Sequence, residues 1–345
     1  MARPSLKFLT LESTCDETAA AIVTDDLQVL ASVVASQEKL HRQYNGVVPE
    51  IAARAHLERV LPVIDETLRR AGLTWEAIDC VAVAHTPGLV GSLLVGVSAA
   101  KTIAFVFDKP LVAVNHLHGH IYACRLASGM EVFPCVGLVV SGGHTHLYRC
   151  AAPSDFELLG GTIDDAAGEA FDKVATMLGL PFPGGPAISR ISNDGDPNAY
   201  SFPRSFLKDA DRLEFSFSGL KTAVRYAITG PGKKDVQAVK LSSQQVADLA
   251  ASFQEAVVDC LVAKTKAALK VTNLKTLCVG GGVAANPRLR SRLASMAESL
   301  GVTWHIAPVE LCTDNAVMGA IAVEQFRAGA LAPLELDVRP GLVRN

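Results

Sequence analysis

Two stretches of this chain share a pattern in which apolar runs flank a short turn of small and polar residues. In residues 6–23 the turn is residues 13–18, and in residues 135–150 it is Ser141-Gly142-Gly143. Such a pattern predicts a β-hairpin. We expect helical periodicity after each hairpin, so the repetition predicts two lobes that each begin with a hairpin.

The other segments alternate between short apolar runs of strand length and longer runs with helical spacing. The predicted strands are residues 80–84, 111–114 and 275–279. The predicted helices are residues 49–72, 90–107, 116–126, 164–179 and 244–269, a segment that begins at Pro287, and residues 316–326. This alternation is typical of the α/β class. We expect lobe I to contain residues 1–130, joined by the C-terminal helix and tail at about 320–345, and lobe II to contain residues 131–320.

Composition and charge exclude several classes of protein. Hydrophobic residues make up 49% of the 345 residues, which is enough for a sizeable core, and the formal net charge of −3 excludes a strongly basic nucleic-acid binder. The 8 cysteines include no CxxC pair, so neither a disulfide scaffold nor a zinc–thiolate site is expected. His85, Pro87 and Lys101 interrupt the most apolar stretch, and no signal segment precedes the first strand, so we expect a cytoplasmic protein.

Three of the chain's 9 histidines lie within five positions, at His116, His118 and His120. On a helix, residues i and i+4 share a face, so His116 and His120 can bind one metal ion while His118 points elsewhere. On a strand, all three would share a face instead. Position 117 is leucine, so the glutamate of the HExxH metalloprotease motif is absent. A polar helix start with incidental histidines is the weaker interpretation, because the histidines are so concentrated.

A third metal ligand could come from the segment Cys312-Thr313-Asp314-Asn315, which precedes the predicted helix 316–326. Asp314 or Thr313 is also a good helix N-cap, and this motif by itself predicts a cap. Together with the histidine pair, however, the Asp314 carboxylate would complete a site of two histidines and one carboxylate.

Two glycine turns follow predicted strands and could bring backbone N–H groups close to a phosphate. The first is Ser141-Gly142-Gly143, for which an ordinary hairpin turn is an equally good interpretation. The second is Gly280-Gly281-Gly282, which leads to Asn286 and the helix that begins at Pro287. This run has neither the dinucleotide-binding nor the Walker spacing. Asn286 is also a good N-cap, and the two roles are compatible.

An acidic stripe marks the predicted helix 164–179, with Asp165, Glu169 and Asp172 at positions i, i+4 and i+7. A solvated helix face is the plain interpretation of this stripe. Alternatively, Asp172 accepts hydrogen bonds from the hydroxyl groups of ribose or of a substrate. Residues 180–186 follow and are rich in proline and glycine, which predicts a rigid connector whose glycines could pass close to a ligand.

These motifs, taken in order along the chain, resemble one family. They are residues 12–18 (Glu-Ser-Thr-Cys-Asp-Glu-Thr), Asn115-His116 with Gly119-His120, residues 140–145 (Val-Ser-Gly-Gly-His-Thr), residues 164–173 (Asp-Asp-Ala-Ala-Gly-Glu-Ala-Phe-Asp-Lys), residues 215–221 (Phe-Ser-Phe-Ser-Gly-Leu-Lys) and residues 312–315 (Cys-Thr-Asp-Asn). They extend over nearly the whole chain. In this order they are similar to the bacterial tRNA N6-threonylcarbamoyladenosine transferase family, formerly called O-sialoglycoprotein endopeptidase.

The resemblance implies a two-lobed fold like those of actin, Hsp70 and the sugar kinases (the ASKHA fold), with a cleft between the lobes. It implies a divalent metal ion, iron or zinc, on residues that match His116, His120 and Asp314. It implies substrate contacts at Val139, Val140, Ser141, Gly142, Gly143, Asp172, Gly185 and Asn286. Thr86 and His118 depart from the family's pattern, in which glycine and an acidic residue are common at these two positions.

The implied reaction transfers the threonylcarbamoyl group of threonylcarbamoyl-AMP to the N6 amine of the adenosine 3′ of the anticodon in ANN-decoding tRNAs, and it releases AMP. This amine is a weak nucleophile because its lone pair is delocalised into the ring, so the enzyme must position it and stabilise the departing AMP. Asp16 is a candidate to help remove the proton that the N6 amine loses during the transfer. The implied partners are tRNA, an inactive paralogue of the same fold (TsaB-like) and a small ATPase (TsaE-like). No association with a membrane is implied.

Two other functions stay open. A small-molecule kinase could share the fold, but the histidine pair argues against it, because phosphoryl transfer needs magnesium on oxygen ligands. A non-catalytic scaffold paralogue would be expected to lack metal ligands, and none is missing here.

Positive charge that could bind RNA is scarce. Arg288, Arg290 and Arg292 lie just after Asn286, beside the proposed nucleotide site, although a solvated helix face is the plain interpretation. Three arginines are few for a tRNA, so we expect partner proteins to complete the RNA-binding groove.

Overall fold

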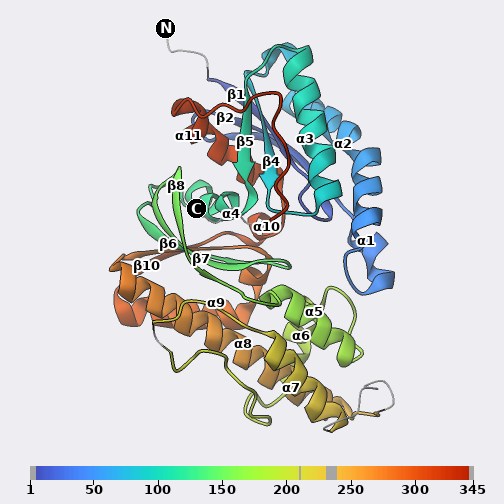
Figure 1. Ribbon diagram of the computed structural model, residues 1–345, viewed down its shortest axis with the longest axis vertical. Coiled ribbons are helices and arrows are strands. Elements are labelled where there is room, and N and C mark those ends of the chain that lie inside the picture. The colour runs from blue at the N-terminus through green and yellow to red at the C-terminus, as the bar shows by residue number, and fades with distance from the viewer. Residues whose placement is uncertain (1–4, 210, 231–238, 342–345) are drawn as a thin grey trace. The chain divides into compact units, whose positions relative to one another are not determined.

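The computed structural model describes residues 5–209, 211–230 and 239–341, and the chain divides into two compact units (Figure 1). Unit 1 comprises Met1–Met130, Pro153–Asp155 and Thr313–Asn345, and unit 2 comprises Glu131–Ala152 and Phe156–Cys312. Each unit is built around a five-stranded sheet with helices packed against it, so the predicted α/β class is confirmed.

The sheet of unit 1 has the strand order β3-β2-β1-β4-β5. These strands are β1 (Lys7–Glu12), β2 (Glu17–Thr24), β3 (Val29–Ser36), β4 (Cys80–Thr86) and β5 (Leu111–Asn115). β1 and β2 form the predicted antiparallel hairpin, and β4 and β5 continue the sheet in parallel from β1. The expectation that helical periodicity follows the hairpin directly is wrong, because the third antiparallel strand β3 comes first.

Alternation along β1 decides what packs on each face of this sheet. Leu9 and Leu11 point into the apolar core formed with α2 (Pro49–Ala71) and α3 (Val90–Val106), which cover one face side by side (Figure 1). Thr10 points to the other face, where its hydroxyl donates a 2.6 Å hydrogen bond to the carbonyl oxygen of Ala316. The other helical elements of this unit include α1 (Glu38–His41), α4 (His116–Ser128), the 3₁₀ turn η5 (Ala316–Ile321) and α11 (Ala322–Arg327).

The sheet of unit 2 has the order β10-β9-β6-β7-β8, which repeats the arrangement of unit 1. Its strands are β6 (Cys135–Val140), β7 (Thr145–Ala152), β8 (Asp155–Gly161), β9 (Thr276–Gly280) and β10 (Thr303–Ile306). β6 and β7 form the second predicted hairpin, and β9 and β10 extend the sheet in parallel from β6. Here too a third strand, β8, follows the hairpin before any helix.

The α-helices described in unit 2 are α5 (Ala167–Met177), α6 (Gly184–Ile191), α7 (Ser218–Thr229), α8 (Ser243–Thr272), α9 (Pro287–Leu300) and α10 (Val309–Cys312). Of these, α5, α8 and α9 were predicted from the spacing, whereas α6, α7 and α10 were not. α8 begins with a capping box, in which the Ser242 hydroxyl accepts from the backbone N–H of Gln245 and the Gln245 side chain accepts from the backbone N–H of Ser242. In the described part of the chain, none of the helices combines the length and apolar character that crossing a bilayer would need.

Candidate functional site

The histidine motif forms the start of α4, as predicted for the helical case. Asn115 caps this helix, because its Oδ1 accepts hydrogen bonds from the backbone N–H groups of Leu117 (2.9 Å) and His118 (3.4 Å). His116 and His120 share one face, with ring centroids 4.6 Å apart, and both rings are buried. Asn115 is also the last residue of β5, so the motif lies at the carboxyl edge of a parallel strand, where open α/β sheets bind ligands.

Asp314 lies opposite the two histidines. Its Oδ1 is 3.5 Å from His116 Nε2 and 3.4 Å from His120 Nε2. The alternative that Asp314 or Thr313 caps the following helix is wrong, because Asn315 takes this role by accepting from the backbone N–H of Met318 at 3.3 Å. The following segment also differs from the predicted continuous helix, since it begins as the 3₁₀ turn η5 before α11.

The three side chains fit a divalent metal ion. One ligand atom from each of His116, His120 and Asp314 lies within 4.8 Å of the others. Neither ring nitrogen of the fully buried His120 makes a well-aligned hydrogen bond with a described residue, and a buried polar atom is normally satisfied by some partner. Two imidazoles and one carboxylate are a donor set that suits iron or zinc. Metal binding itself stays a proposal.

Burial and nearby carboxylates shift the pKa values of the three histidines in different directions. Burial lowers the pKa of His116, but Glu12 and Asp314 outweigh burial and raise that pKa to about 9. The pKa of His120 is lowered, chiefly by burial, and burial lowers the pKa of His118 to about 4. A cation on His116 Nε2 would therefore replace a proton, which makes metal binding weaker at lower pH.

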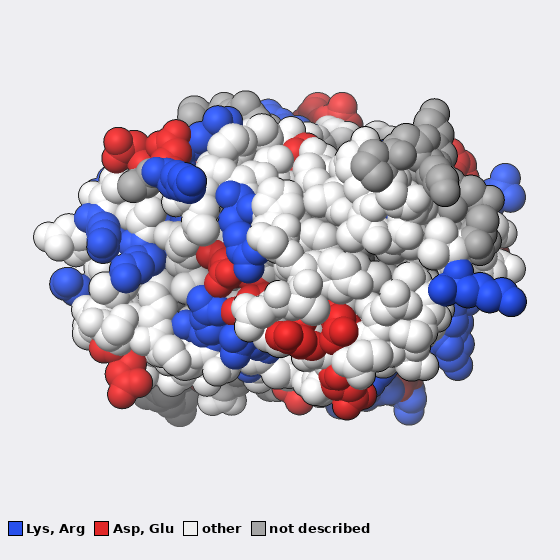
Figure 2. All heavy atoms as spheres, turned by 90° about the horizontal axis from the view of Figure 1, so that it is seen from below, with Lys and Arg blue, Asp and Glu red and all other residues white. Residues whose placement is uncertain are grey.

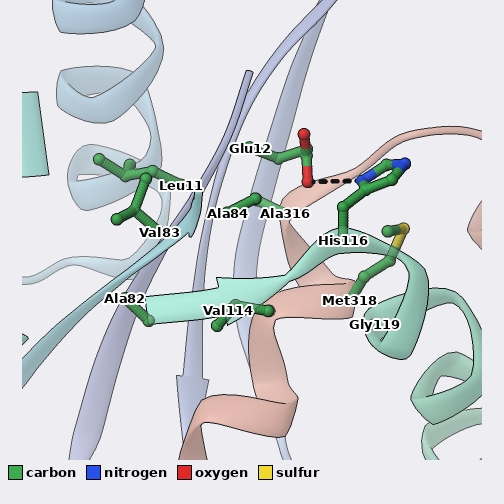
Figure 3. A pocket seen from close by; sticks show the side chains of 11 residues that line it. Leu11, Glu12, Ala82, Val83, Ala84, Val114, His116, Gly119, Ala316 and Met318 are labelled. Atoms are coloured by element: carbon green, nitrogen blue, oxygen red, sulfur yellow. Dashed lines mark hydrogen bonds and ion pairs between the residues drawn. The ribbon is translucent and has the colours of Figure 1, made fainter. Parts of the chain in front are cut away.

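The end of β1 and the loop between β1 and β2 reach the same site, where Glu12, the last residue of β1, had no role predicted from the sequence. Glu12 Oε2 is 3.0 Å from His116 Nδ1, and Glu12 Oε1 accepts from the backbone N–H of Thr14 at 2.7 Å. The dashed line in Figure 3 marks the contact between Glu12 and His116. The Thr14 hydroxyl lies 3.3 Å from the same ring nitrogen. The only sequence signal for Glu12 was its place at the start of the family motif 12–18.

Asp16, the candidate for proton removal, belongs to this loop. Its backbone carbonyl accepts from Gln37 N at 3.0 Å. Burial, followed by the nearby charge of Asp16, raises the pKa of the Cys15 thiol. Burial raises the pKa of the neighbouring Glu17 carboxyl to about 8, although a hydrogen bond from Ser36 opposes this. The catalytic role of Asp16 remains a proposal.

The departure at Thr86 is accommodated by the C-terminal segment. The Thr86 hydroxyl donates to the carbonyl of Gly341 at 3.3 Å, and Gly88 N donates to the carbonyl of Pro340 at 3.2 Å. Gly88 also passes so close to the β1–β2 loop that a Cβ there would lie 2.6 Å from the Thr14 carbonyl oxygen. The segment Thr86–Gly88 therefore helps to hold the loop that follows Glu12.

In unit 2 the two predicted glycine turns lie together at the carboxyl ends of β6 and β9. Val139 and Val140 are the buried end of β6, and Val139 pairs with Gly280 of β9. Ser141 follows directly, and a Cβ on either Gly142 or Gly143 would meet nothing within 4 Å, so open space lies beside this turn. This is the edge where parallel strands present ligand-binding loops.

The start of α5 packs against the Ser141-Gly142-Gly143 turn. Gly168 N donates to the Ser141 carbonyl at 3.2 Å, and Glu169 N donates to the Gly142 carbonyl at 3.0 Å. A Cβ on Gly168 would lie 2.5 Å from the Ser141 carbonyl oxygen, so only glycine permits this approach. These bonds occupy the carbonyl groups of Ser141 and Gly142.

Asp172 on α5 lies beside Gly184 and Gly185, which were predicted to belong to a rigid connector but form the start of helix α6. The backbone N–H of Gly184 donates to Asp172 Oδ1 at 2.7 Å, and a Cβ on Gly184 would lie 2.6 Å from the Asp172 Cα. Burial, with a smaller contribution from Glu169, raises the pKa of Asp172 to about 6 although the Gly184 hydrogen bond opposes this. A Cβ on Gly185 would meet nothing within 4 Å. The Asp172 carboxyl group is therefore largely removed from water, and open space lies beside the nearby Gly185.

Asn286 caps α9, as predicted, and its side chain also contacts α8. Its Oδ1 accepts from Leu289 N at 3.1 Å, which confirms the N-cap, while its Nδ2 donates to Gln254 Oε1 on α8 at 2.8 Å. Gln254 was not among the predicted site residues, because a glutamine in a long amphipathic helix carries no distinct sequence signal. The Asn286 amide is thus oriented from both ends and still has one N–H that could reach a ligand.

The predicted helix 164–179 begins three residues late, at Ala167, because the preceding acids have other partners. Asp164 accepts from the hydroxyls of Ser216 and Ser218 at 2.6 Å each. Asp165 accepts from Lys173 Nζ at 2.8 Å and from Lys221 Nζ at 2.7 Å. The solvated-face interpretation of the acidic stripe is therefore wrong for Asp165.

The three arginines after Asn286 are engaged by other groups of unit 2. Arg288 pairs with Glu255 at 2.7 Å, and Arg292 pairs with Glu255 and with Asp259. Arg290 donates to the carbonyls of Ala284 (2.8 Å) and Ala307 (2.9 Å). On the face drawn in Figure 2, basic and acidic side chains lie interspersed among uncharged ones. Glu255 and Asp259 on α8 therefore offset much of the positive charge of the arginines at the start of α9.

Comparison with known proteins gives one consistent result. The sequence model of the family "TsaD: tRNA N6-adenosine threonylcarbamoyltransferase" matches residues 28–321. A protein named tRNA N6-adenosine threonylcarbamoyltransferase from Rhodopirellula baltica is 56% identical, over 98% of this chain and 97% of its own. One of the same name from Symbiobacterium thermophilum is 52% identical, over 97% of this chain and 96% of its own.

Solved structures with low sequence identity share the fold. HypF from T. kodakarensis has a TM-score of 0.63 at 13% identity, over 95% of this chain and 49% of that one. Component A of the (R)-2-hydroxyglutaryl-CoA dehydratase of Acidaminococcus fermentans has a TM-score of 0.52 at 15% identity, over 94% of this chain and 99% of that one. These similarities confirm the actin/Hsp70/sugar-kinase-like fold class and carry no further argument.

Proposed function

Because this chain belongs to the tRNA N6-adenosine threonylcarbamoyltransferase family, it is a transferase that forms N6-threonylcarbamoyladenosine in tRNA, and we propose that threonylcarbamoyl-AMP is its donor and that a divalent metal ion assists the transfer. The family also excludes the kinase and the non-catalytic scaffold that the motifs left open. The convergence of His116, His120 and Asp314 carries the metal part of the proposal. A divalent ion bound there, iron or zinc, would supply a Lewis acid for the donor.

The chain's own residues supply the remaining requirements of this reaction. The departing AMP carries negative charge. The backbone N–H groups of Ser141, Ala284 and Asn286 already donate to carbonyl oxygens of their own turns, so the N–H groups of Gly142, Gly143 and Gly282 are the ones suited to bind its phosphate. Asp172, with a pKa of about 6, would be mainly ionised at neutral pH and would accept hydrogen bonds from a ribose or threonyl hydroxyl. Open space beside Gly185 gives such a group room. Asp16 would take the proton that the amine loses.

A reconstituted reaction tests the proposed donor. The purified chain, its TsaB-like and TsaE-like partners, an ANN-decoding tRNA and threonylcarbamoyl-AMP are incubated together, and the digested nucleosides are then analysed. We expect N6-threonylcarbamoyladenosine and AMP in equal amounts. A matched reaction with a tRNA whose base 3′ of the anticodon is not adenosine should give neither product. Product formation that does not consume threonylcarbamoyl-AMP would contradict the donor assignment.

An apolar surface on unit 1 supports the proposed association with a TsaB-like paralogue. Leu57 and Leu61 lie one turn apart on α2 and are 67% and 64% exposed. Val90 and Leu94 form the same spacing on the adjacent helix α3 and are also exposed. α2 and α3 approach closely at their starts, where a Cβ on Gly91 would lie 3.0 Å from the Ala53 Cβ. We propose that these four residues, the α2–α3 surface, contact the paralogue.

The double substitution Leu57→Glu with Leu61→Glu is expected to weaken binding of the paralogue by about 100-fold or more, because two carboxylates would be buried without partners. Both side chains are solvent-exposed in this chain, so its melting temperature should change little. Phe105→Glu is the matched control, since Phe105 is 73% exposed on α3 but about 16 Å along the helix from Leu94. Titration calorimetry measures the affinities. Equal affinities for the wild type and the double variant would rule out this surface.

The charge distribution predicts how tRNA binding depends on salt. The net charge is −3 and Arg288, Arg290 and Arg292 are all engaged, so we expect weak binding by the chain alone. The logarithm of the affinity falls linearly with the logarithm of the salt concentration. Partners that add phosphate contacts should make the slope of this line steeper by about 0.7–0.9 per contact. Affinities measured from about 50 to 200 mM salt, with and without partners, test this. Equally tight binding and equal slopes in both cases would contradict it.

A further inference from the structure

We propose that Glu12 is a positioning residue of the metal centre, because its carboxylate fixes His116 in the tautomer that presents the Nε2 lone pair to the ion. This inference rests on the proposed metal site and goes beyond it, since Glu12 is not one of the three candidate ligands. Glu12 is the last residue of β1 and is only 4% exposed.

The two oxygens of Glu12 have different partners. Oε1 accepts from the backbone N–H of Thr14 at 2.7 Å, and Oε2 is 3.0 Å from His116 Nδ1 (Figure 3). An ionised carboxylate can only accept hydrogen bonds, so His116 Nδ1 must carry the hydrogen between them. The other ring nitrogen, Nε2, is the one that lies 3.5 Å from Asp314 Oδ1. The Nδ1 atom of His116 thus contacts Glu12, whereas its Nε2 atom faces Asp314 and the proposed ion.

This arrangement has a general physical basis. A histidine that binds a metal through one nitrogen usually donates its other N–H to a carboxylate or carbonyl, which fixes the ring and makes it a better ligand. Glu12 can do this with little motion of its own, because its second oxygen is held by the backbone of Thr14. The β1–β2 loop thereby also becomes mechanically connected to the metal-binding helix α4.

Glu12→Gln is a selective test of this role. The Thr14 N–H always donates, so the amide oxygen of the substituted side chain must face Thr14, and its NH₂ group must then face His116 Nδ1. A neutral His116 can accept there only if its proton is on Nε2, the atom that should bind the ion. The substitution therefore keeps the loop contact but favours the wrong tautomer.

The expected result is a loss of Zn²⁺ affinity of about 10- to 100-fold in Glu12→Gln, measured on the full chain by competition with a chromophoric chelator. In the Zn²⁺-loaded wild type, the His116 Nδ1–H should give a slowly exchanging NMR signal, assigned by its absence from His116→Ala. This signal should be lost in Glu12→Gln. Glu12→Asp keeps a carboxylate on a shorter arm, so its affinity should lie between the two. If Glu12→Gln does not fold, Glu12→Asp decides the question, because an unchanged affinity in Glu12→Asp overturns the proposal.

Thr14→Val is the matched control. It removes the hydroxyl that lies 3.3 Å from His116 Nδ1 but keeps the backbone N–H that Glu12 binds. Its Zn²⁺ affinity should stay near that of the wild type, and a loss equal to that of Glu12→Gln would assign the positioning role to Thr14 instead.

Two outcomes separate this proposal from the metal site on which it rests. If His116→Ala and His120→Ala keep full Zn²⁺ affinity, the metal site is wrong, and the role of Glu12 is overturned with it. If both alanine variants lose the ion while Glu12→Gln binds it like the wild type, only the proposal for Glu12 is overturned.

Discussion

Replacing His116 or His120 with alanine is expected to remove most of the bound iron or zinc and to lower the transferase rate by about 100- to 1000-fold. Each substitution deletes one of three ligands and leaves the Asp314 carboxylate facing a cavity. Loss of a Lewis acid worth several kcal/mol gives a rate effect of this size, because about 1.4 kcal/mol corresponds to a factor of ten. Elemental analysis of the purified variants and the nucleoside assay measure the two effects.

His118→Ala provides the comparison on the same helix. The rings of His116 and His120 share a face of α4, and His118 is not one of the three candidate ligands. We therefore expect near-normal metal content in this variant. Full metal occupancy in His116→Ala, or equal losses in all three variants, would show that the ion is not bound by the proposed set.

Gly281→Ala is expected to destabilise unit 2 by about 2–5 kcal/mol and to abolish binding of an adenylate, since it combines backbone strain with a steric clash. Gly281 has φ +95°, which L residues rarely adopt, and a Cβ there would lie 2.4 Å from the Val140 carbonyl oxygen. That oxygen belongs to the backbone of β6 and cannot move aside cheaply. The shift would reach both turns that we assign to the donor, because Ser141 follows Val140 directly.

Gly282→Ala is a matched control in the next position. A Cβ on Gly282 would meet nothing within 4 Å, and its φ is not in the left-handed region. Thermal unfolding and calorimetric titration with AMP compare the two variants. We expect a clear loss of both stability and affinity only in Gly281→Ala. Equal behaviour of the two variants would show that close packing of this turn on β6 is unimportant for nucleotide binding.

Hydrophobic patterning failed at three of the four edge strands that the structure describes: β3, β8 and β10 were not predicted, whereas β5 was. The hairpins β1–β2 and β6–β7 were predicted because their strands are almost entirely buried apolar runs. β3 was missed, since Val29, Leu30 and Val34 are all exposed and its apolar residues show no regular alternation. An edge strand has one neighbour and a poorly covered face, so its sequence carries a weak signal. The same reason applies to β8, at the edge of the other sheet.

The start of α5 shows how long-range contacts override local preference. The predicted helix began at position 164, and acidic residues such as those at 164 and 165 suit the first turn of a helix. The structure instead uses Asp164 to bind Ser216 and Ser218, and Asp165 to bind Lys221, partners more than 50 residues away. Nothing in the local sequence distinguishes these two uses of an aspartate.

The sequence by itself determined the family, both hairpins and the shared face of His116 and His120, because each of these depends on residue order or on spacing within one element. It left Asp314 undecided between a cap and a ligand, since a short polar side chain before a helix suits both roles. Only the tertiary structure decided this, by giving the cap to Asn315 and bringing Asp314 to the histidines. The contact between Glu12 and His116 joins residues 104 positions apart. Such a contact depends on how strands and helices pack in three dimensions, which no local pattern records.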